Sequence, residues 1–284
     1  MEHFLKTALE IVRRMVAEGH TVGNHTYNHI VDISLITNKE IFQKEMNREK
    51  GSMSIKAQCW NLKRKCLNKL RRKKKIALTF DDGHKYADQI LEKLEQHGVK
   101  STFFLCGTCI EKSRDIYKKI FDAGHELGNH SYNHPHMVEL SEGEILSELN
   151  RTEQLLSQVT DGKESLKLFR FPYGSNNEGA IRLVESQGFI PVTWTVDSKD
   201  WTGISDEEIC NNVLKSEHLE HGAIILMHTS GAHTVEALDL LIPELRKKGY
   251  EMMKISELFH EIPQYKKMVS EIKGSECLWQ DQSV

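Results

Sequence analysis

Short apolar segments alternate with amphipathic segments from residue 76 onward, and this alternation restricts the chain to few folds. The apolar segments predict strands over Ile76–Phe80, Ser101–Leu105, Glu126–Asn129, Leu168–Phe169, Ile190–Thr195 and Ala223–Met227. Helical spacing of apolar residues predicts helices between them over Tyr86–Gln96, Glu111–Asp122, Ser141–Gln158, Glu178–Gln187, Asp206–Leu219 and Val235–Lys247. Such alternation is typical of an α/β fold with a parallel sheet.

Most of the predicted helices are followed by a glycine, which suits a left-handed C-cap. These glycines are Gly98, Gly124, Gly188, Gly222 and Gly249. Polar clusters follow several of the strands, where a barrel places its active site. Together with the number of strand–helix units, this favours a (β/α) barrel over an open sheet.

The composition fits a globular protein with a core more than a nucleic-acid or membrane protein. The net charge of the 284 residues is −3, and no apolar run reaches the ~18 residues that a membrane span needs. The sequence Met1–Glu10 lacks the basic-then-apolar order of a signal peptide. We therefore expect neither a membrane span nor an encoded export signal, and no nucleic-acid partner.

The segment Gly19–His29 repeats most of Gly124–His134 at an offset of 105 residues, and each copy follows an amphipathic helix. The N-terminal copy has His25 and His29 but no paired aspartates before them. We interpret it as a truncated duplicate of one βα segment. A second metal site there would need an acid from another chain.

Strongly basic residues mark a change of composition between the repeat and the first strand, at Lys63–Lys65 and Lys69–Lys75. A patch that binds nucleic acid or an anionic surface is one interpretation, and a solvated linker is the other. We expect a linker, which divides the chain into 1–50 (truncated duplicate), 51–73 (linker), 74–262 (barrel domain) and 263–284 (C-terminal tail).

Two adjacent acids, Asp81 and Asp82, follow the first predicted strand. Neighbouring strand residues point to opposite faces, so both can serve one pocket only where the strand ends. Their repulsion requires a cation, an arginine or a shared proton nearby.

His130 and His134 follow the third predicted strand at i and i+4. On one face of a helical turn, two such imidazoles can reach one metal. The pair alone is a weak signal, since surface and core histidines often have this spacing. With a carboxylate from another strand it matches a catalytic, hydrolytic metal site.

Three further clusters follow later strands. Arg170 can offset a carboxylate, and the turn in Arg170–Gly174 can aim a backbone N–H inward, unless it is only a surface turn. Asp197–Trp201 offers two acids and an aromatic ring, or merely a helix cap. His228 can be a general acid or a near-core histidine.

Cys106 and Cys109 form a CxxC motif directly after the second predicted strand. The six cysteines are scattered, so they do not form a disulfide framework. The motif predicts either small loop-lining residues or a redox pair or half a metal site.

Five motifs in order resemble the polysaccharide deacetylase family, the NodB-homology group of carbohydrate esterase family 4. They are Thr79–Gly83, His130–His134, Arg170–Gly174, Asp197–Trp201 and Leu226–His228. The resemblance covers roughly residues 74–260 and implies a distorted (β/α)7-8 barrel. It implies removal of N-acetyl groups from an N-acetylated glycan, and leans to peptidoglycan or chitooligosaccharide substrates.

The resemblance also implies a divalent metal, usually zinc, with cobalt and other divalent ions as alternatives. By position, its ligands would be Asp82, His130 and His134. Trp201 and Leu226 would line the pocket for the acetyl methyl group.

The resemblance assigns catalytic roles by position as well. Asp81 would be the general base, held by Arg170. The Tyr173 backbone N–H would bind the oxyanion, and Asp197 would tune His228, the general acid.

Some features depart from the family pattern. His84 and Phe171 stand where the family commonly has proline. Family members usually work outside the cell with an export signal or anchor, and neither is evident in this sequence. An O-acetyl esterase and a catalytically inactive glycan-binding module are the alternative functions.

Overall fold

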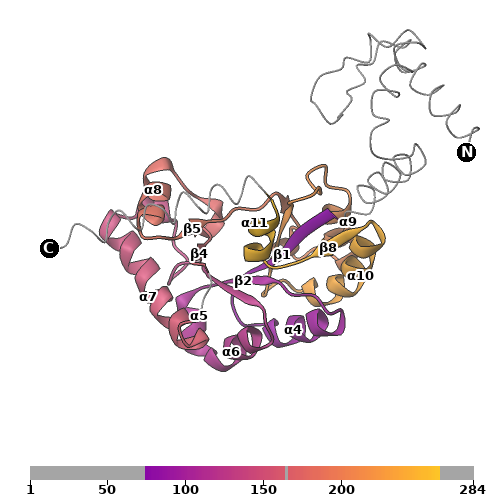
Figure 1. Ribbon diagram of the computed structural model, residues 1–284, viewed down its shortest axis with the longest axis horizontal. Coiled ribbons are helices and arrows are strands. Elements are labelled where there is room, and N and C mark those ends of the chain that lie inside the picture. The colour runs from indigo at the N-terminus through magenta and orange to yellow at the C-terminus, as the bar shows by residue number, and fades with distance from the viewer. Residues whose placement is uncertain (1–73, 164–165, 263–284) are drawn as a thin grey trace, which may run out of the picture. The chain divides into compact units, whose positions relative to one another are not determined.

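The computed structural model describes residues 74–163 and 166–262 (Figure 1). All described residues lie in the unit Lys73–Val284. The predicted segments 1–50, 51–73 and 263–284 lie outside the described residues, as does the repeat with His25 and His29. No helix in the described ranges is long and apolar enough to cross a membrane.

A parallel sheet forms the centre of this unit, and its order is β5-β4-β3-β2-β1-β7-β6. The strands are β1 (Lys74–Asp82), β2 (Thr102–Leu105), β3 (Glu126–Asn129), β4 (Leu168–Phe169), β5 (Ile190–Pro191), β6 (Val196–Asp197) and β7 (Ile224–His228). β8 (Tyr250–Met252) pairs with the first residues of β1. No pairing between β5 and β6 is found in the part of the chain that is described, so the predicted barrel is confirmed in a distorted, open form.

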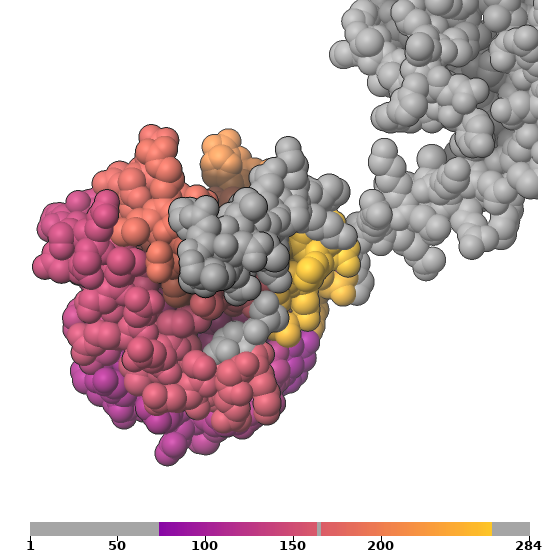
Figure 2. Space-filling view, turned by 60° about the vertical axis from the view of Figure 1, so that its left-hand side comes forward, coloured from indigo at the N-terminus to yellow at the C-terminus, as the bar shows by residue number. Residues whose placement is uncertain are grey.

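Helices surround the sheet (Figure 1). They are α4 (Ala87–Gln96), α5 (Gly107–Lys112), α6 (Arg114–Asp122), α7 (Glu142–Thr160), α8 (Glu178–Ser186), α9 (Asp206–Leu214), α10 (Thr234–Lys247) and α11 (Ile255–Glu261). The described ranges also contain the short 3₁₀ turns η2 (Met137–Glu139), η3 (Pro172–Gly174) and η4 (Asp200–Thr202). In the space-filling view the indigo and magenta part of the chain forms one continuous surface (Figure 2).

The helix ends follow the local sequence. Four of the glycines predicted to end helices do so with positive φ, between 58° and 85°, namely Gly98, Gly124, Gly188 and Gly249. The prediction was wrong for Gly222, because α9 already ends at Leu214. Ser141 and Ser205 begin α7 and α9 with capping boxes that satisfy free N–H groups of the first turn.

Alternate residues of β1 serve two different cores. Ile76, Leu78 and Phe80 belong to the larger cluster, which includes the buried faces of α4, α6 and α10. Ala77 belongs to a second cluster, to which α11 contributes. Each such buried aliphatic or aromatic side chain stabilises the fold by about 1.5–3 kcal/mol. The face of Ala77 continues through Thr79 to Asp81, because successive strand residues alternate between faces.

Some expectations about individual elements were wrong. In place of the strand Ile190–Thr195, β5 covers only Ile190–Pro191, and β6 begins after the predicted strand, at Val196. The helix Glu111–Asp122 breaks at Ser113, whose φ of −145° is not helical. α9 ends at Leu214 and not at Leu219. β8 and α11 were not predicted, because each is short and its pattern is weak.

Candidate functional site

The carboxyl ends of the strands bring the predicted site residues to one edge of the sheet. The strand register pairs Asp81 with His228 on β7. It also pairs Asp82 with Leu105 and Leu105 with Asn129, the residue before His130. Residues far apart in sequence therefore meet because parallel strands end together.

Asp81 and Asp82 differ in environment although they are neighbours. Asp81 is buried, whereas Asp82 is partly exposed at the last position of β1. Asp82 has φ 80°, a left-handed conformation that costs free energy for a residue other than glycine. This turn lets the Asp82 carboxylate lie beside the histidines, as the sequence predicted for a strand end.

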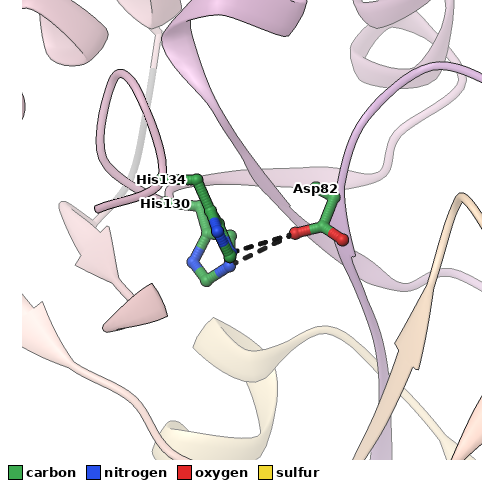
Figure 3. Close-up of side chains that lie close together, drawn as sticks. All are labelled: Asp82, His130 and His134. Carbon is green, nitrogen blue, oxygen red and sulfur yellow. Dashed lines mark ion pairs between the residues drawn. The ribbon is translucent and has the colours of Figure 1, made fainter. Parts of the chain in front are cut away.

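Asp82, His130 and His134 form one cluster of metal-ligand type (Figure 3). The Asp82 Oδ1 atom lies 3.6 Å from His130 Nε2 and 3.3 Å from His134 Nε2. Two nitrogen or oxygen ligands of tetrahedral zinc, each ~2.0–2.1 Å from the ion, lie ~3.3 Å apart. The three residues thus fit a divalent ion with open coordination positions.

His130 is prepared for this role by its second ring nitrogen. Its Nδ1 lies 2.8 Å from the Arg170 carbonyl oxygen, which can only accept, so Nδ1 carries the proton and Nε2 is free. Burial lowers the pKa of His130 to about 3, although Asp82 opposes this shift. A neutral imidazole is the form that binds a metal.

The segment from His130 to His134 is a loop, so the predicted helical turn was wrong. Ser131 and His134 have φ 65° and 59°, which no α-helix contains. The buried Glu148 of α7 holds the loop, because its Oε2 accepts the Tyr132 and Asn133 backbone N–H groups at 2.8 and 2.7 Å. The loop conformation still directs both imidazoles at Asp82 (Figure 3).

Arg170 compensates Asp81, as the sequence predicted. Its Nη1 donates to Asp81 Oδ1 at 2.7 Å and to Thr79 Oγ1 at 2.8 Å. The guanidinium is buried, and its Cζ lies 4.1 Å from the centre of the Phe104 ring. Burial raises the pKa of Asp81 above its usual value, and Arg170 opposes that rise. A buried carboxylate with a raised pKa is a stronger base than an exposed one.

Asp200, and not Asp197, is the partner of His228, so this part of the prediction was wrong. Asp200 Oδ1 lies 2.8 Å from His228 Nδ1. The carboxylate of Asp197 instead accepts the Lys199 backbone N–H at 2.8 Å. Lys199 has φ 58°, and this left-handed turn places the Asp200 carboxylate within hydrogen-bond distance of His228, the last residue of β7.

The remaining predicted residues lie around the same strand ends. Tyr173 has φ 59°, and its exposed ring stacks on His136 with the ring centres 4.1 Å apart. Trp201 lies in η4, and 61% of its surface is exposed. Leu226 is buried in β7. Their roles toward a substrate stay predictions.

Sequence reasoning missed Glu148 and the supporting threonines. Glu148 lies on the apolar face of α7 between Ile145 and Leu149, and an acid on such a face could have been noticed. Thr234 Oγ1 donates to Asp200 Oδ2 at 2.6 Å, and nothing in the sequence indicates that contact.

The chain resembles known proteins in its sequence. A family model described as polysaccharide deacetylase matches residues 1–57 and 68–192. A peptidoglycan-N-acetylglucosamine deacetylase of Bacillus cereus is 40% identical over 193 residues, which are 66% of this chain and 69% of that protein.

Two solved structures resemble the fold. The Bc1960 peptidoglycan N-acetylglucosamine deacetylase is 36% identical with a TM-score of 0.62, covering 66% of this chain and 89% of that one. BA3943 of Bacillus anthracis, described as a CE4 family pseudoenzyme, is 35% identical with a TM-score of 0.62, covering 66% of each chain. Similar folds therefore include both enzymes and a pseudoenzyme.

Proposed function

The chain belongs to the polysaccharide deacetylase family, and from that premise we propose that it is a metal-dependent N-deacetylase of peptidoglycan or a chitooligosaccharide. The reaction hydrolyses the acetamide of an N-acetylated sugar and releases acetate. Asp82, His130 and His134 would hold the ion. When bound, a zinc ion would lower the pKa of a water ligand from ~16 towards ~7 and polarise a carbonyl.

The proposed roles of the chain's own groups follow from their partners. Asp81 accepts the proton of the attacking water. Burial raises the pKa of its carboxyl group, and the ion pair with Arg170 favours the ionised form that can accept a proton. His228 protonates the departing sugar amine, because Asp200 favours its charged form. We propose that the Tyr173 backbone N–H donates a hydrogen bond to the oxyanion that forms when water attacks the acetamide. One such donor stabilises the transition state by roughly 3–4 kcal/mol.

One observation supports an active enzyme over an inactive module. The register places Asp81 directly opposite His228, and each has its own charged partner, Arg170 and Asp200. A base and an acid with separate partners of opposite sign can hold different protonation states at one pH. A module that only binds glycans does not need an acid and a base held in different protonation states.

Acetate release tests the proposal and separates the alternatives. Muropeptides, chitooligosaccharides and acetylated xylan are incubated with the full chain, with and without a chelator, and with zinc restored. We expect acetate from an N-acetylated glycan, loss with chelator and recovery with zinc. Release from acetylated xylan alone would indicate an O-acetyl esterase, and no release from any substrate would contradict an enzyme.

A further inference from the structure

The CxxC motif of Cys106 and Cys109 lies next to the backbone of the metal-ligand cluster. Cys106 follows β2 and is the N-cap of α5, and Cys109 lies one turn later, with its N–H donating to the Cys106 carbonyl at 3.0 Å. Both thiols are free. Side chains three residues apart in a helical turn are neighbours, so this turn brings the two sulfurs together.

The two thiols differ in access. Cys106 is buried and Cys109 is partly exposed. The neighbouring Cys106 thiol lowers the pKa of Cys109 to about 6, burial opposes the shift, and His84 adds to it. The more accessible sulfur is therefore the better nucleophile.

The same pair contacts the backbone of two predicted metal ligands. The Cys106 N–H donates to the Asp82 carbonyl at 3.3 Å, and the Cys106 S–H donates to the His130 carbonyl, with 3.7 Å between sulfur and oxygen. The Cys109 sulfur packs against the residue after Asp82, since a Cβ added at Gly83 would lie 3.3 Å from it. A change at these sulfurs must reach both Asp82 and His130.

We propose that Cys106 and Cys109 form a redox-active dithiol that closes to a disulfide and thereby lowers the metal affinity of the neighbouring Asp82, His130 and His134. The first half of this proposal is independent of the proposed function. The second half uses the same metal ligands and rests on that function.

The reaction takes a disulfide oxidant of the glutathione type. The Cys109 thiolate attacks one oxidant sulfur, which forms a mixed disulfide and releases one thiolate. Cys106 then loses its proton and attacks the Cys109 sulfur, which releases the second oxidant thiol. The first released thiolate takes up the proton that Cys109 lost on ionisation. Counted from the dithiol, the chain has then lost two electrons and two protons, and the oxidant disulfide has become two thiols.

Oxidation removes a contact beside the metal ligands. A disulfide sulfur has no proton, so Cys106 can no longer donate to the His130 carbonyl. Changes in groups that support metal ligands alter metal affinity by roughly 10–100-fold.

The dithiol is tested on the full chain in a series of reduced and oxidised glutathione buffers, followed by acid quenching, alkylation and peptide mapping. We expect a peptide with an internal Cys106–Cys109 disulfide, lighter by two hydrogens, that returns to the dithiol in reduced buffer. Cys210, a buried thiol on α9, is the control and stays alkylatable after denaturation. Persistence of both thiols in every buffer, or a stable mixed disulfide alone, would overturn the proposal.

The link to the metal is tested by zinc competition with a chromophoric chelator on the reduced and oxidised chain. We expect roughly tenfold weaker zinc binding after oxidation. The variant Cys106→Ser/Cys109→Ser should bind zinc equally in both buffers. Equal affinity of the two wild-type forms would refute the coupling. Absence of zinc binding in both forms would refute the coupling too and contradict the proposed metal site, while the peptide map would still decide on the dithiol.

Discussion

Asp200 holds His228 at two points: its Oδ1 lies 2.8 Å from His228 Nδ1, and its Oδ2 accepts the His228 backbone N–H at 2.7 Å. Burial pushes the pKa of His228 down, but the Asp200 hydrogen bond and the nearby carboxylates raise it above its usual value. The ring therefore stays protonated to a higher pH than a free histidine, as a general acid requires.

Asp200→Asn should move the alkaline limb of the pH profile of kcat/KM to lower pH. The protonated ring is needed, and activity falls as the pH rises through the His228 pKa. Without the Asp200 charge, burial dominates and that pKa falls. His228→Ala should lose roughly 10²–10⁴-fold in kcat. The pH profile of acetate release is the measurement.

Asp197→Asn is the matched control for Asp200→Asn. Its carboxylate only accepts the Lys199 backbone N–H, and an amide oxygen can do the same. We expect an unchanged pH profile. A shift for Asp197→Asn as large as that for Asp200→Asn would refute the assignment.

Asp82→Ala and His134→Ala should lose zinc binding, whereas Asp81→Asn should bind zinc and lose turnover. Asp82 and His134 are cluster members whose ligand atoms lie 3.3 Å apart, while Asp81 is held by Arg170. Isothermal titration with zinc and acetate release measure the two properties. His218→Ala is the control, because its exposed ring lies 3.7 Å from Glu217 and is not a member of the cluster. A fully active, metal-free Asp82→Ala protein would contradict the metal site.

Strand order explains why much of the site could be predicted. Asp82, His130 and Arg170 each come directly after a short apolar segment, and parallel strands end at one edge of a sheet. That rule needs no knowledge of loop conformation. The pairing of Arg170 with Asp81 was implied by the family resemblance, and a buried acid needs such a cation.

Loop conformation explains the errors. Asp197 ends β6 and Asp200 follows it, and spacing alone does not tell which carboxylate contacts His228. The left-handed conformation of Lys199 directs Asp200 to that contact. The loop between His130 and His134 depends on Glu148, which lies in a different element. Interactions of this kind are tertiary, so helical spacing was the wrong guide.

Arg170→Leu should destabilise the fold by about 3–5 kcal/mol, because it leaves Asp81 buried without its cation. The double variant Asp81→Asn/Arg170→Leu should recover part of this loss. Urea unfolding followed by circular dichroism is the measurement. Arg182→Leu, which breaks an exposed ion pair with Glu178 on α8, is the control and should leave stability nearly unchanged. Equal effects of Arg170→Leu and Arg182→Leu would show that the buried pair contributes little.

Glu148→Ala should weaken zinc binding by roughly 10–100-fold although it removes no ligand. Glu148 accepts the Tyr132 and Asn133 backbone N–H groups and the Asn133 side-chain amide, and these three bonds fix the loop before His134. Without them the imidazole of His134 loses its fixed direction toward Asp82. Glu142→Ala, at the exposed start of the same helix, should bind zinc like the wild type. Zinc titration and urea unfolding are measured for both variants. A general weakening of α7 would lower the unfolding midpoint of both, whereas a loss of ligand positioning would weaken zinc binding in Glu148→Ala alone. Unchanged zinc affinity in Glu148→Ala would mean that the ion itself, and not α7, organises the loop.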